Sequence, residues 1–251
     1  MKKILLLLLN AALSFNTVSA QNSYVAAKDG LSFREQPAIT AKLITKIPYG
    51  TKLTIIQEDS EWIPVRAEGI NGYWRKVKYE NNTGYVADCY LIPAPPPTNT
   101  ITDMPGYFSQ LSKEFGKKLV IRSSPDDIEE GGWVLEKQLY ENGTETHHFQ
   151  GYEYGSMTYF LPEFTMQQAF LVVRLIAEFK EVFKENDNFP DSDKTFTRDG
   201  REYSIKVEKE NYGGDFNWIK KVAVEFEYGA IYYFELYQVD SQVVIFLGAG
   251  V

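Results

Sequence analysis

Short apolar runs, each followed by turn-forming residues, fill residues 24–92. The run "KLITKI" precedes Pro48-Tyr49-Gly50, and "KLTII" precedes a polar stretch. The alternating run "YWRKVKY" leads into Asn81-Asn82-Thr83-Gly84, and "GYVADCYL" closes the set. Short strands at such regular spacing are typical of small closed sheets. The pattern predicts a small β-barrel of four or five strands.

Residues 101–185 combine strand-like runs with helical periodicity. A short helix is expected around "PGYFSQLSKEFGKK", followed by strands in "KLVIRS", "GWVLEKQLY", "ETHHFQGYEY" and "SMTYFL". The segment "TMQQAFLVVRLIAEFKEVFKEN" then predicts one long amphipathic helix, and Thr165 with Gln168 fits a capping box at its start. The expected apolar face holds Ala169, Val172, Val173, Ile176, Phe179 and Phe183, and the expected polar face holds Gln167, Arg174, Glu178, Glu181 and Glu185.

The last fifth of the chain is purely strand-like. The runs "EYSIKVEKENY", "IKKVAVEFEY", "IYYFELYQV" and "VVIFLG" alternate and are joined by the short turns Gly213-Gly214, Gly229-Ala230 and Asp240-Ser241. Short connections between consecutive strands produce an antiparallel meander. The predicted fold class is therefore a small β-barrel followed by an α+β domain, with an antiparallel sheet and one long helix across one face.

Two further segments set the expected boundaries. The N-terminus, "MKKILLLLLNAALSFNTVSA", predicts a signal peptide over residues 1–20 that is cleaved after Ala20 and is too short to span a bilayer. We therefore expect an exported protein, periplasmic or extracellular, with no membrane span. The proline-rich "IPAPPPTNT" predicts a semi-stiff linker. The expected divisions are a barrel at 23–93, a linker at 94–100 and the α+β domain at 101–251.

The charge is distributed unevenly between the two parts. The whole chain of 251 residues carries a formal charge of −8. Residues 23–93 hold 9 basic and 8 acidic side chains, whereas residues 101–251 hold 15 basic and 26 acidic ones. Such an acidic chain repels phosphate backbones, which argues against nucleic acid as a partner. The asymmetry also favours two domains.

The order of motifs in residues 24–92 resembles that of the bacterial SH3 (SH3b) domain family. The segments "GLSFREQPAITAKLITKIPYGTKLTII" and "GYWRKVKYENNTGYVADCYL" contain the matching positions in sequence. The resemblance implies a binding module whose ligand is a cell-wall peptide or another extended peptide. The positions that carry the resemblance are Leu31, Phe33, Arg34, Gly50, Thr51, Trp74, Val77, Gly84, Tyr85, Val86, Tyr90 and Leu91.

The chain departs from the family pattern by inserting "QEDSEWIPVRAEGINGY" before Trp74. This insertion brings a second tryptophan, Trp62, and an expected turn at Gly69-Ile70-Asn71-Gly72. Trp62 either lines a ligand groove or closes one end of the barrel, and the sequence leaves both open. Trp74 is likewise either a groove or a core residue. The candidate ligand-binding residues are Trp62, Tyr73, Trp74, Tyr85 and Tyr90.

The residues that would carry catalysis or bind metal are sparse. Cys89 is the only cysteine, and a cysteine nucleophile needs a nearby base. The only histidines, His147 and His148, lie in the other part of the chain, so we interpret Cys89 as a small apolar residue. The two histidines would point to opposite faces of a strand, and a metal site needs three or four ligands. We therefore predict no catalytic residue, no metal and no cofactor.

Three further patterns point only weakly to chemistry. Asp191 to Glu202 spaces its acids like a calcium loop, but Phe196 stands where glycine is required, so a solvated loop is the ordinary interpretation. Asp126, Asp127, Glu129, Glu130 and Glu153 offer carboxylates without a defined separation, and the run before Gly131-Gly132 is expected to be an exposed loop. Tyr152, Tyr154 and Tyr159 suit either a stacking surface or strand packing, of which packing is favoured.

These observations lead to one hypothesis and two alternatives. The hypothesis is an exported, non-enzymatic binding protein, in which the SH3b-like domain targets cell-wall peptide or an envelope protein and the acidic domain serves as a scaffold or second interaction surface. The first alternative is a cell-wall hydrolase whose α+β domain is catalytic. The second is a structural envelope protein. Oligomeric state is not determined by these patterns.

Overall fold

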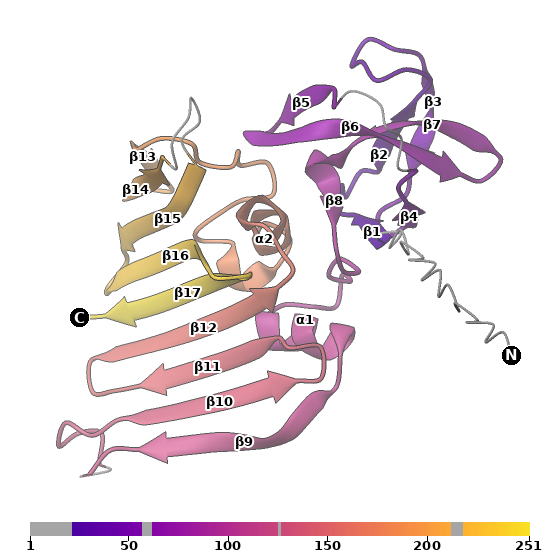
Figure 1. The fold of residues 1–251 in the computed structure, drawn as a ribbon. Coiled ribbons are helices and arrows are strands. Elements are labelled where there is room, and N and C mark those ends of the chain that lie inside the picture. Colours follow the sequence, from indigo (N-terminus) through magenta and orange to yellow (C-terminus); the bar gives the residue numbers. More distant parts are fainter. Residues whose placement is uncertain (1–21, 57–61, 125–126, 212–217) are drawn as a thin grey trace, which may run out of the picture.

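The fold is mostly β, with two α-helices among the residues described (Figure 1). The structure is a computed structural model that describes residues 22–56, 62–124, 127–211 and 218–251. The predicted signal peptide lies outside these residues. Within them, no helix combines the length and apolar character needed to cross a bilayer.

The N-terminal part consists of two antiparallel sheets packed around a small core. One sheet has the order β3-β2-β7-β6-β5 and the other has the order β4-β1-β8. Their shared core contains Val25, Leu31, Phe33, Ile47, Leu53, Val77, Val86 and Leu91. The strands are β1 (Asn22–Val25), β2 (Leu31–Arg34), β3 (Leu43–Ile47), β4 (Lys52–Thr54), β5 (Pro64–Ala67), β6 (Ile70–Tyr79), β7 (Asn82–Ala87) and β8 (Leu91–Ile92), with a 3₁₀ turn, η1 (Asp88–Tyr90), before β8.

The described part of the inserted segment contains β5 and the start of β6, which form a hairpin. Glu68 and Gly69 both have positive φ, at 51° and 77°, and they form the two-residue turn between these strands. A tight hairpin turn of this kind requires positive φ at both central residues. The turn expected at Gly69 to Gly72 therefore begins one residue earlier, and Ile70 to Gly72 belong to β6.

The C-terminal part is built on one nine-stranded antiparallel sheet, which confirms the predicted meander. Its order is β13-β14-β15-β16-β17-β12-β11-β10-β9. Strand β13, in the segment predicted as an acidic loop, was not expected. The strands are β9 (Glu114–Arg122), β10 (Val134–Tyr140), β11 (Glu145–Gln150), β12 (Tyr154–Pro162), β13 (Lys194–Arg198), β14 (Arg201–Glu210), β15 (Trp218–Glu227), β16 (Ile231–Val239) and β17 (Gln242–Gly250).

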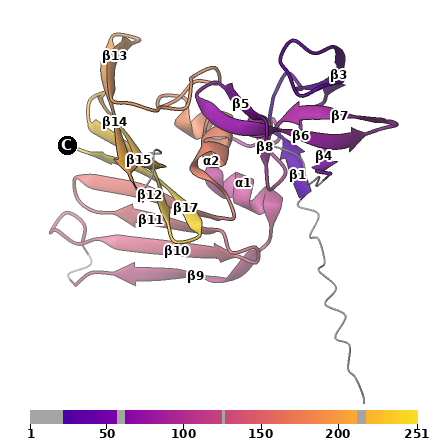
Figure 2. The ribbon, with the colours of Figure 1, turned by 45° about the horizontal axis from the view of Figure 1, so that its top comes forward.

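Both helices lie between the nine-stranded sheet and the N-terminal part (Figure 2). They are α1 (Met104–Leu111) and α2 (Met166–Val173). Asp103 caps α1 by accepting a hydrogen bond from the Gly106 N–H. The predicted capping box at α2 is confirmed, because the Thr165 and Gln168 side chains each accept from the other's backbone N–H. Alternating residues of the sheet, such as Phe234 and Leu236 on β16, are fully buried on the helix side.

The prediction of one long helix was wrong, because α2 ends at Val173. Ile176 adopts an extended conformation, and only a short 3₁₀ turn, η2 (Ala177–Phe179), follows. The expected apolar side chains from Ala169 to Phe183 are still buried. The break redirects the chain, so that a residue expected on the polar face, Glu178, points inward.

Glu178 joins the break in the helix to α1 and the sheet. Its carboxylate accepts hydrogen bonds from the Tyr159 hydroxyl and from the Met104 N–H, the latter at 2.9 Å. Its own N–H donates to the Thr102 carbonyl at 2.9 Å. Burial raises the pKa of the Glu178 carboxyl, although the two hydrogen bonds partly oppose this shift. A continuous helix would not allow these contacts.

The two parts of the chain share one hydrophobic core. Ala26, Ile70, Ala87, Cys89 and Ile92 of the N-terminal part belong to the same buried cluster as α1, α2 and the large sheet. The burial of apolar surface between the two parts opposes their separation. The proline-rich segment therefore connects two parts that are already in contact.

The backbone carbonyls of the proline-rich segment are held by side chains from both parts. The Tyr107 hydroxyl and the Gln110 amide of α1 donate to the carbonyls of Pro95 and Pro96, at 3.0 and 2.9 Å. The Tyr49 hydroxyl of the N-terminal part donates to the Pro97 carbonyl at 2.7 Å. These bonds fix the course of the segment along its length.

The tip of the β5–β6 hairpin makes a close contact with the C-terminal part. The Phe189 N–H donates to the Glu68 carbonyl at 2.8 Å. The Glu68 carboxylate pairs with Arg174 at 2.6 Å, and Arg66 pairs with Asp191 at 2.5 Å. A Cβ atom at Gly69 would overlap the backbone of Phe189, so the close approach requires glycine.

We predict that Gly69→Ala destabilises the protein more than a matched change at another glycine. The substitution adds a left-handed strain of about 1–2 kcal/mol and a collision with Phe189. Gly229→Ala is the control, because Gly229 also has positive φ, at 71°, but has nothing near its Cβ position. Urea denaturation should show a loss at Gly69 that exceeds the loss at Gly229 by at least about 1 kcal/mol. Equal losses would contradict the proposed close contact.

Candidate functional site

An exposed aromatic cluster lies on the N-terminal part, at the start of β6. The rings of Trp62 and Tyr73 meet edge to face, with centroids 5.0 Å apart. The Arg75 guanidinium lies 3.9 Å from the Trp62 ring centroid. Trp62 is 63% exposed and Tyr73 is 40% exposed. Two exposed aromatic rings in contact with each other and with an arginine form a candidate binding patch, because aromatic residues and arginine are enriched at interfaces.

Asp88, the first residue of η1, holds this cluster in place. Its carboxylate accepts the Arg75 Nε–H at 2.8 Å and the Tyr73 backbone N–H at 2.7 Å. Tyr73 and Arg75 are two positions apart on β6, so they share a face of the strand. Asp88 therefore holds Arg75 and the backbone of Tyr73 in place, and Trp62 packs against both side chains before any ligand arrives, which lowers the entropic cost of binding.

Trp74 and Tyr85 lie on the opposite face of the β6–β7 pair. Trp74 is opposite Ala87, and Lys76 is opposite Tyr85, so the two aromatic residues are diagonal neighbours. Both rings are half-buried. Arg34 is paired with Tyr85 from the other side, on β2. This second surface is less exposed than the Trp62 cluster.

Tyr90 is placed at the junction between the two parts. Its hydroxyl donates to the Glu68 carboxylate at 3.1 Å, and its ring packs against both hydrophobic clusters. Burial, and then the charge of Glu68, raise the pKa of the Tyr90 hydroxyl to about 12. The five predicted ligand residues thus lie in three places. Trp62 and Tyr73 form the exposed cluster, Trp74 and Tyr85 lie on the opposite face of the β6–β7 pair, and Tyr90 lies at the junction. Arg75 and Asp88 were not predicted, although the two-residue spacing of Tyr73 and Arg75 on a strand pointed to the former.

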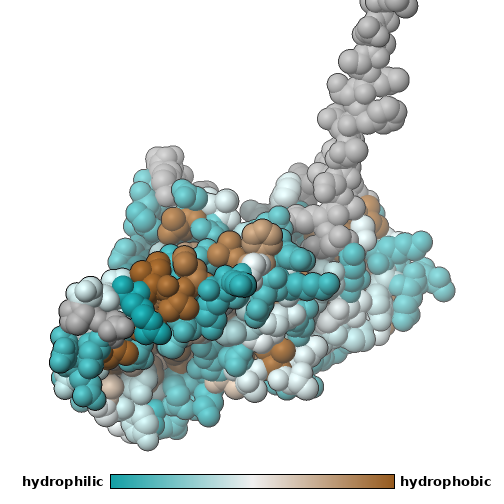
Figure 3. Space-filling model, turned by 90° about the horizontal axis from the view of Figure 1, so that it is seen from below, coloured by the Kyte–Doolittle hydropathy of each residue, from teal (hydrophilic) through white to brown (hydrophobic). Residues whose placement is uncertain are grey.

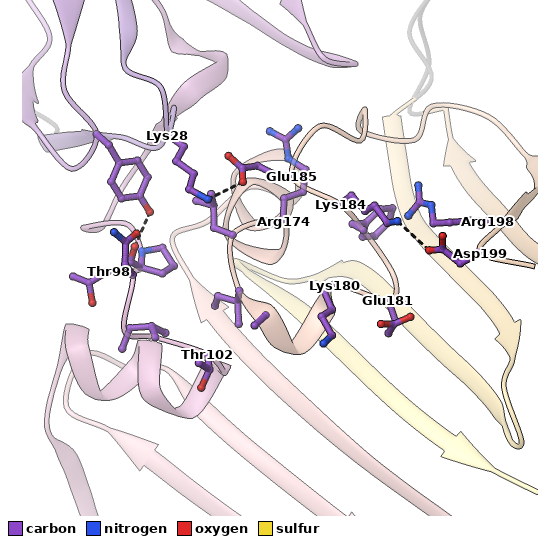
Figure 4. A pocket seen from close by; sticks show the side chains of 18 of the residues that line it. Lys28, Thr98, Thr102, Arg174, Lys180, Glu181, Lys184, Glu185, Arg198 and Asp199 are labelled. Carbon is purple, nitrogen blue, oxygen red and sulfur yellow. Dashed lines mark hydrogen bonds and ion pairs between the residues drawn. The ribbon is translucent and has the colours of Figure 1, made fainter. Parts of the chain in front are cut away.

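A cleft of about 570 Å³ opens between the two parts (Figure 4). Lys28 reaches from the N-terminal part to Glu185 at 2.8 Å, and Lys184 pairs with Asp199 at 3.0 Å. Charged side chains from both parts line it, but these pairs neutralise much of their charge. Its lining includes Lys28, Tyr49, Thr98, Thr102, Arg174, Lys180, Glu181, Lys184, Glu185, Arg198 and Asp199.

The calcium-like segment forms the hairpin of β13 and β14. Its acids engage separate basic partners: Asp191 binds Arg66, and Asp199 binds Lys184. Asp193 pairs with Lys206 at 2.9 Å. The hairpin therefore spreads the carboxylates instead of gathering them around one point. Among the described residues, no cluster of three or more histidine, cysteine or acidic side chains is arranged to hold a metal.

The two histidines are separated as adjacent strand residues must be. His147 Nε2 lies 2.5 Å from a Glu145 carboxylate oxygen, and its ring packs near Phe160. His148 points to the other face of β11. The two histidine side chains therefore do not point toward a common metal or ligand site.

The remaining candidate acids and tyrosines differ in how deeply they are buried. Asp127, Glu129 and Glu130 are exposed in the loop between β9 and β10, as predicted, while Asp126 lies outside the described residues. Tyr159 is fully buried, which confirms the packing interpretation for that residue. Tyr152 and Tyr154 remain at the surface.

Cys89 is a buried thiol in η1, within the core shared by the two parts. Its Sγ lies 3.5 Å from the Ile70 carbonyl oxygen, to which it donates. Burial, and then the negative charge of Asp88, raise the pKa of the Cys89 thiol to about 11. A thiol in this state is a poor nucleophile.

We predict that native Cys89 resists thiol reagents. At pH 8, a pKa of about 11 leaves roughly one thiol in a thousand ionised, whereas an unfolded cysteine is ionised to about a quarter. Labelling with a chromogenic disulfide at pH 8 should be at least about a hundredfold slower in the native protein than in urea. Because the chain has one cysteine, the signal reports this site alone. Complete labelling of the folded protein within minutes would refute the assignment.

Comparison with known proteins identifies one segment of the chain. A family model for the bacterial SH3 domain matches residues 29–91, and the rest of the chain matches no family. No curated protein and no solved structure matches the chain. The match includes β2 to β7 and all five predicted ligand residues. Residues 29–91 are therefore a bacterial SH3 domain.

Proposed function

We propose that this chain is an exported, non-enzymatic binding protein whose SH3 domain holds a cell-wall peptide or another extended peptide against the Trp62–Tyr73 cluster. Bacterial SH3 domains suggest binding or cell-wall targeting. The observation that carries the proposal is the exposure of two aromatic rings that contact each other and Arg75, whose guanidinium is bound by Asp88. A flat peptide unit stacks on such rings at little entropic cost.

The chemistry of the cluster favours a ligand with both apolar and anionic groups. Trp62 and Tyr73 offer ring faces and edges, and Arg75 has further N–H groups beyond the one that binds Asp88. A carboxylate-bearing peptide would meet both needs. The domain itself is close to neutral, with 9 basic and 8 acidic side chains in residues 23–93, so long-range repulsion of such a ligand is weak.

The C-terminal part serves, in this proposal, as the scaffold to which the SH3 domain is fixed. The shared core and the contacts of the hairpin tip hold Trp62 and Tyr73 in a constant orientation relative to the large sheet. Its 26 acidic against 15 basic side chains in residues 101–251 repel polyanions. Ligand selection is thereby left to the SH3 domain.

We predict that Trp62→Ala weakens binding of the chain from residue 21 onward to purified peptidoglycan. Truncating a central aromatic residue of an interface costs about 2 kcal/mol or more, so the apparent affinity in co-sedimentation should fall at least about tenfold. Tyr73→Ala should act in the same direction. The chain is used whole because separating its parts would expose their shared core.

Trp218→Ala is the matched control, since Trp218 is 65% exposed and lies on β15, in the other part of the chain. It should bind like the wild type. If Trp74→Ala abolished binding while Trp62→Ala left it intact, the binding surface would be the opposite face of the β6–β7 pair. Release of soluble fragments from the peptidoglycan would overturn the non-enzymatic assignment.

A further inference from the structure

Strand β9 is an edge strand that is exposed along its whole length. It ends the nine-stranded sheet, and each of its residues from Glu114 to Arg122 is exposed. Phe115 is 63% exposed, Leu119 54% and Val120 44%. Figure 3 views the molecule from below, the side on which β9 is the lowest strand in Figure 1, and it shows a hydrophobic patch among hydrophilic residues.

The backbone of β9 offers a regular set of hydrogen-bonding groups on its outer side. The Ser123 N–H donates to the Trp133 carbonyl at 3.0 Å, so Ser123 faces the chain of β10. Because backbone groups alternate along a strand, Ile121 and Leu119 also face β10. The N–H and C=O groups of Lys118, Val120 and Arg122 therefore point outward, where the sheet ends.

The regular part of this edge is short. A register shift interrupts the pairing of β10 and β9 between Lys137 and Leu139, and Gly116 has a φ of 72°. A bulge of this kind bends the strand and stops a further strand from pairing beyond it. Residues 118–122 are thus the segment that can accept a new antiparallel partner.

This segment is complementary to itself. If a two-fold axis passes through Val120, that residue faces its equivalent, and Lys118 faces Arg122 of the second copy. All three outward-facing residues then form pairs that exchange both backbone hydrogen bonds. The same register places Leu119 opposite Ile121 of the second copy, on the outer face of the sheet. Cross-strand apolar pairs of this kind stabilise antiparallel sheets.

The charges of the segment oppose this register in part, and this opposition contributes to the weakness of the contact. Lys118 and Arg122 of opposite copies would repel, but Lys118 already pairs with Glu136 at 3.0 Å. Glu136 lies on β10, directly beside Val120. The carboxylate is therefore next to the axis and offsets the added cation.

The other edge of the sheet does not offer an equivalent partner. Strand β13 is short, and its sequence, "KTFTR", places Thr195 and Thr197 toward solvent. Pairing of β9 with β13 of another molecule would bury these polar side chains against an apolar strand, and it would form an open chain of molecules. Pairing of β9 with itself closes after two copies.

We infer that β9 is a self-association edge, through which two copies of this chain join their nine-stranded sheets antiparallel about Val120. Specific stable interfaces bury about 1,600 Å² of surface, and a contact through this short segment buries less than that. The dimer is therefore weak and depends on concentration, with a dissociation constant in the range of about 1–100 μM.

Sedimentation velocity tests this inference on the chain from residue 21 onward, between about 2 and 200 μM, a range that brackets the expected dissociation constant. The wild type should change from monomer to dimer across this range. Val120→Pro should remain monomeric, because its N–H points outward and proline removes only the donor that the second copy needs. Far-UV circular dichroism checks that this variant is folded.

Thr195→Pro is the matched control, since the Asp199-Gly200 hairpin pairs Arg198 with Arg201 and leaves the Thr195 N–H facing outward on β13. It should dimerise like the wild type. Hydrogen exchange of the wild type provides a test without substitution: protection of the Val120 and Arg122 amides should rise with protein concentration. A wild type that stays monomeric at about 200 μM, or a folded Val120→Pro that dimerises equally, would overturn the inference.

Discussion

The contact between the β5–β6 hairpin tip and Phe189 determines how the two parts of this protein are joined. A backbone hydrogen bond to Glu68, an ion pair between Glu68 and Arg174, and the missing Cβ of Gly69 act at one point. The residue that follows this turn, Ile70, is buried in the shared core. The insertion into the SH3 domain is therefore an attachment element as well as the carrier of Trp62.

This attachment also bears on the binding role proposed for the aromatic cluster. Strand β6 runs from the docked tip to Tyr73 and Arg75, so the residues that face solvent are connected to the junction by one continuous strand. Asp88 binds both of them from η1, next to the buried Cys89. A rigid junction therefore also keeps the proposed binding surface rigid. This favours binding, because less conformational entropy of the protein is lost when a ligand binds.

Local signals in the sequence predicted much of the fold, and contacts between distant segments account for what was missed. The alternating runs identified the meander, and Thr165 with Gln168 identified the start of α2. The predicted helix was too long because the spacing of apolar residues carries no information about the hydrogen bonds of Glu178. These bonds reach Tyr159 and Met104, and they require the helix to end earlier. Aromatic composition identified the candidate ligand residues, but it could not assign them to separate faces, since that depends on strand register.

In the proposed function, the ligand contacts Trp62 on a surface that is already formed. The chain has four tryptophans, and each gives one indole N–H resonance in a ¹H–¹⁵N spectrum. Titration with soluble peptidoglycan fragments should produce the largest chemical-shift change at the Trp62 resonance, with little change at Trp133 and Trp218. Saturating ligand that leaves Trp62 unmoved, or that shifts Trp218 instead, would contradict the proposed site.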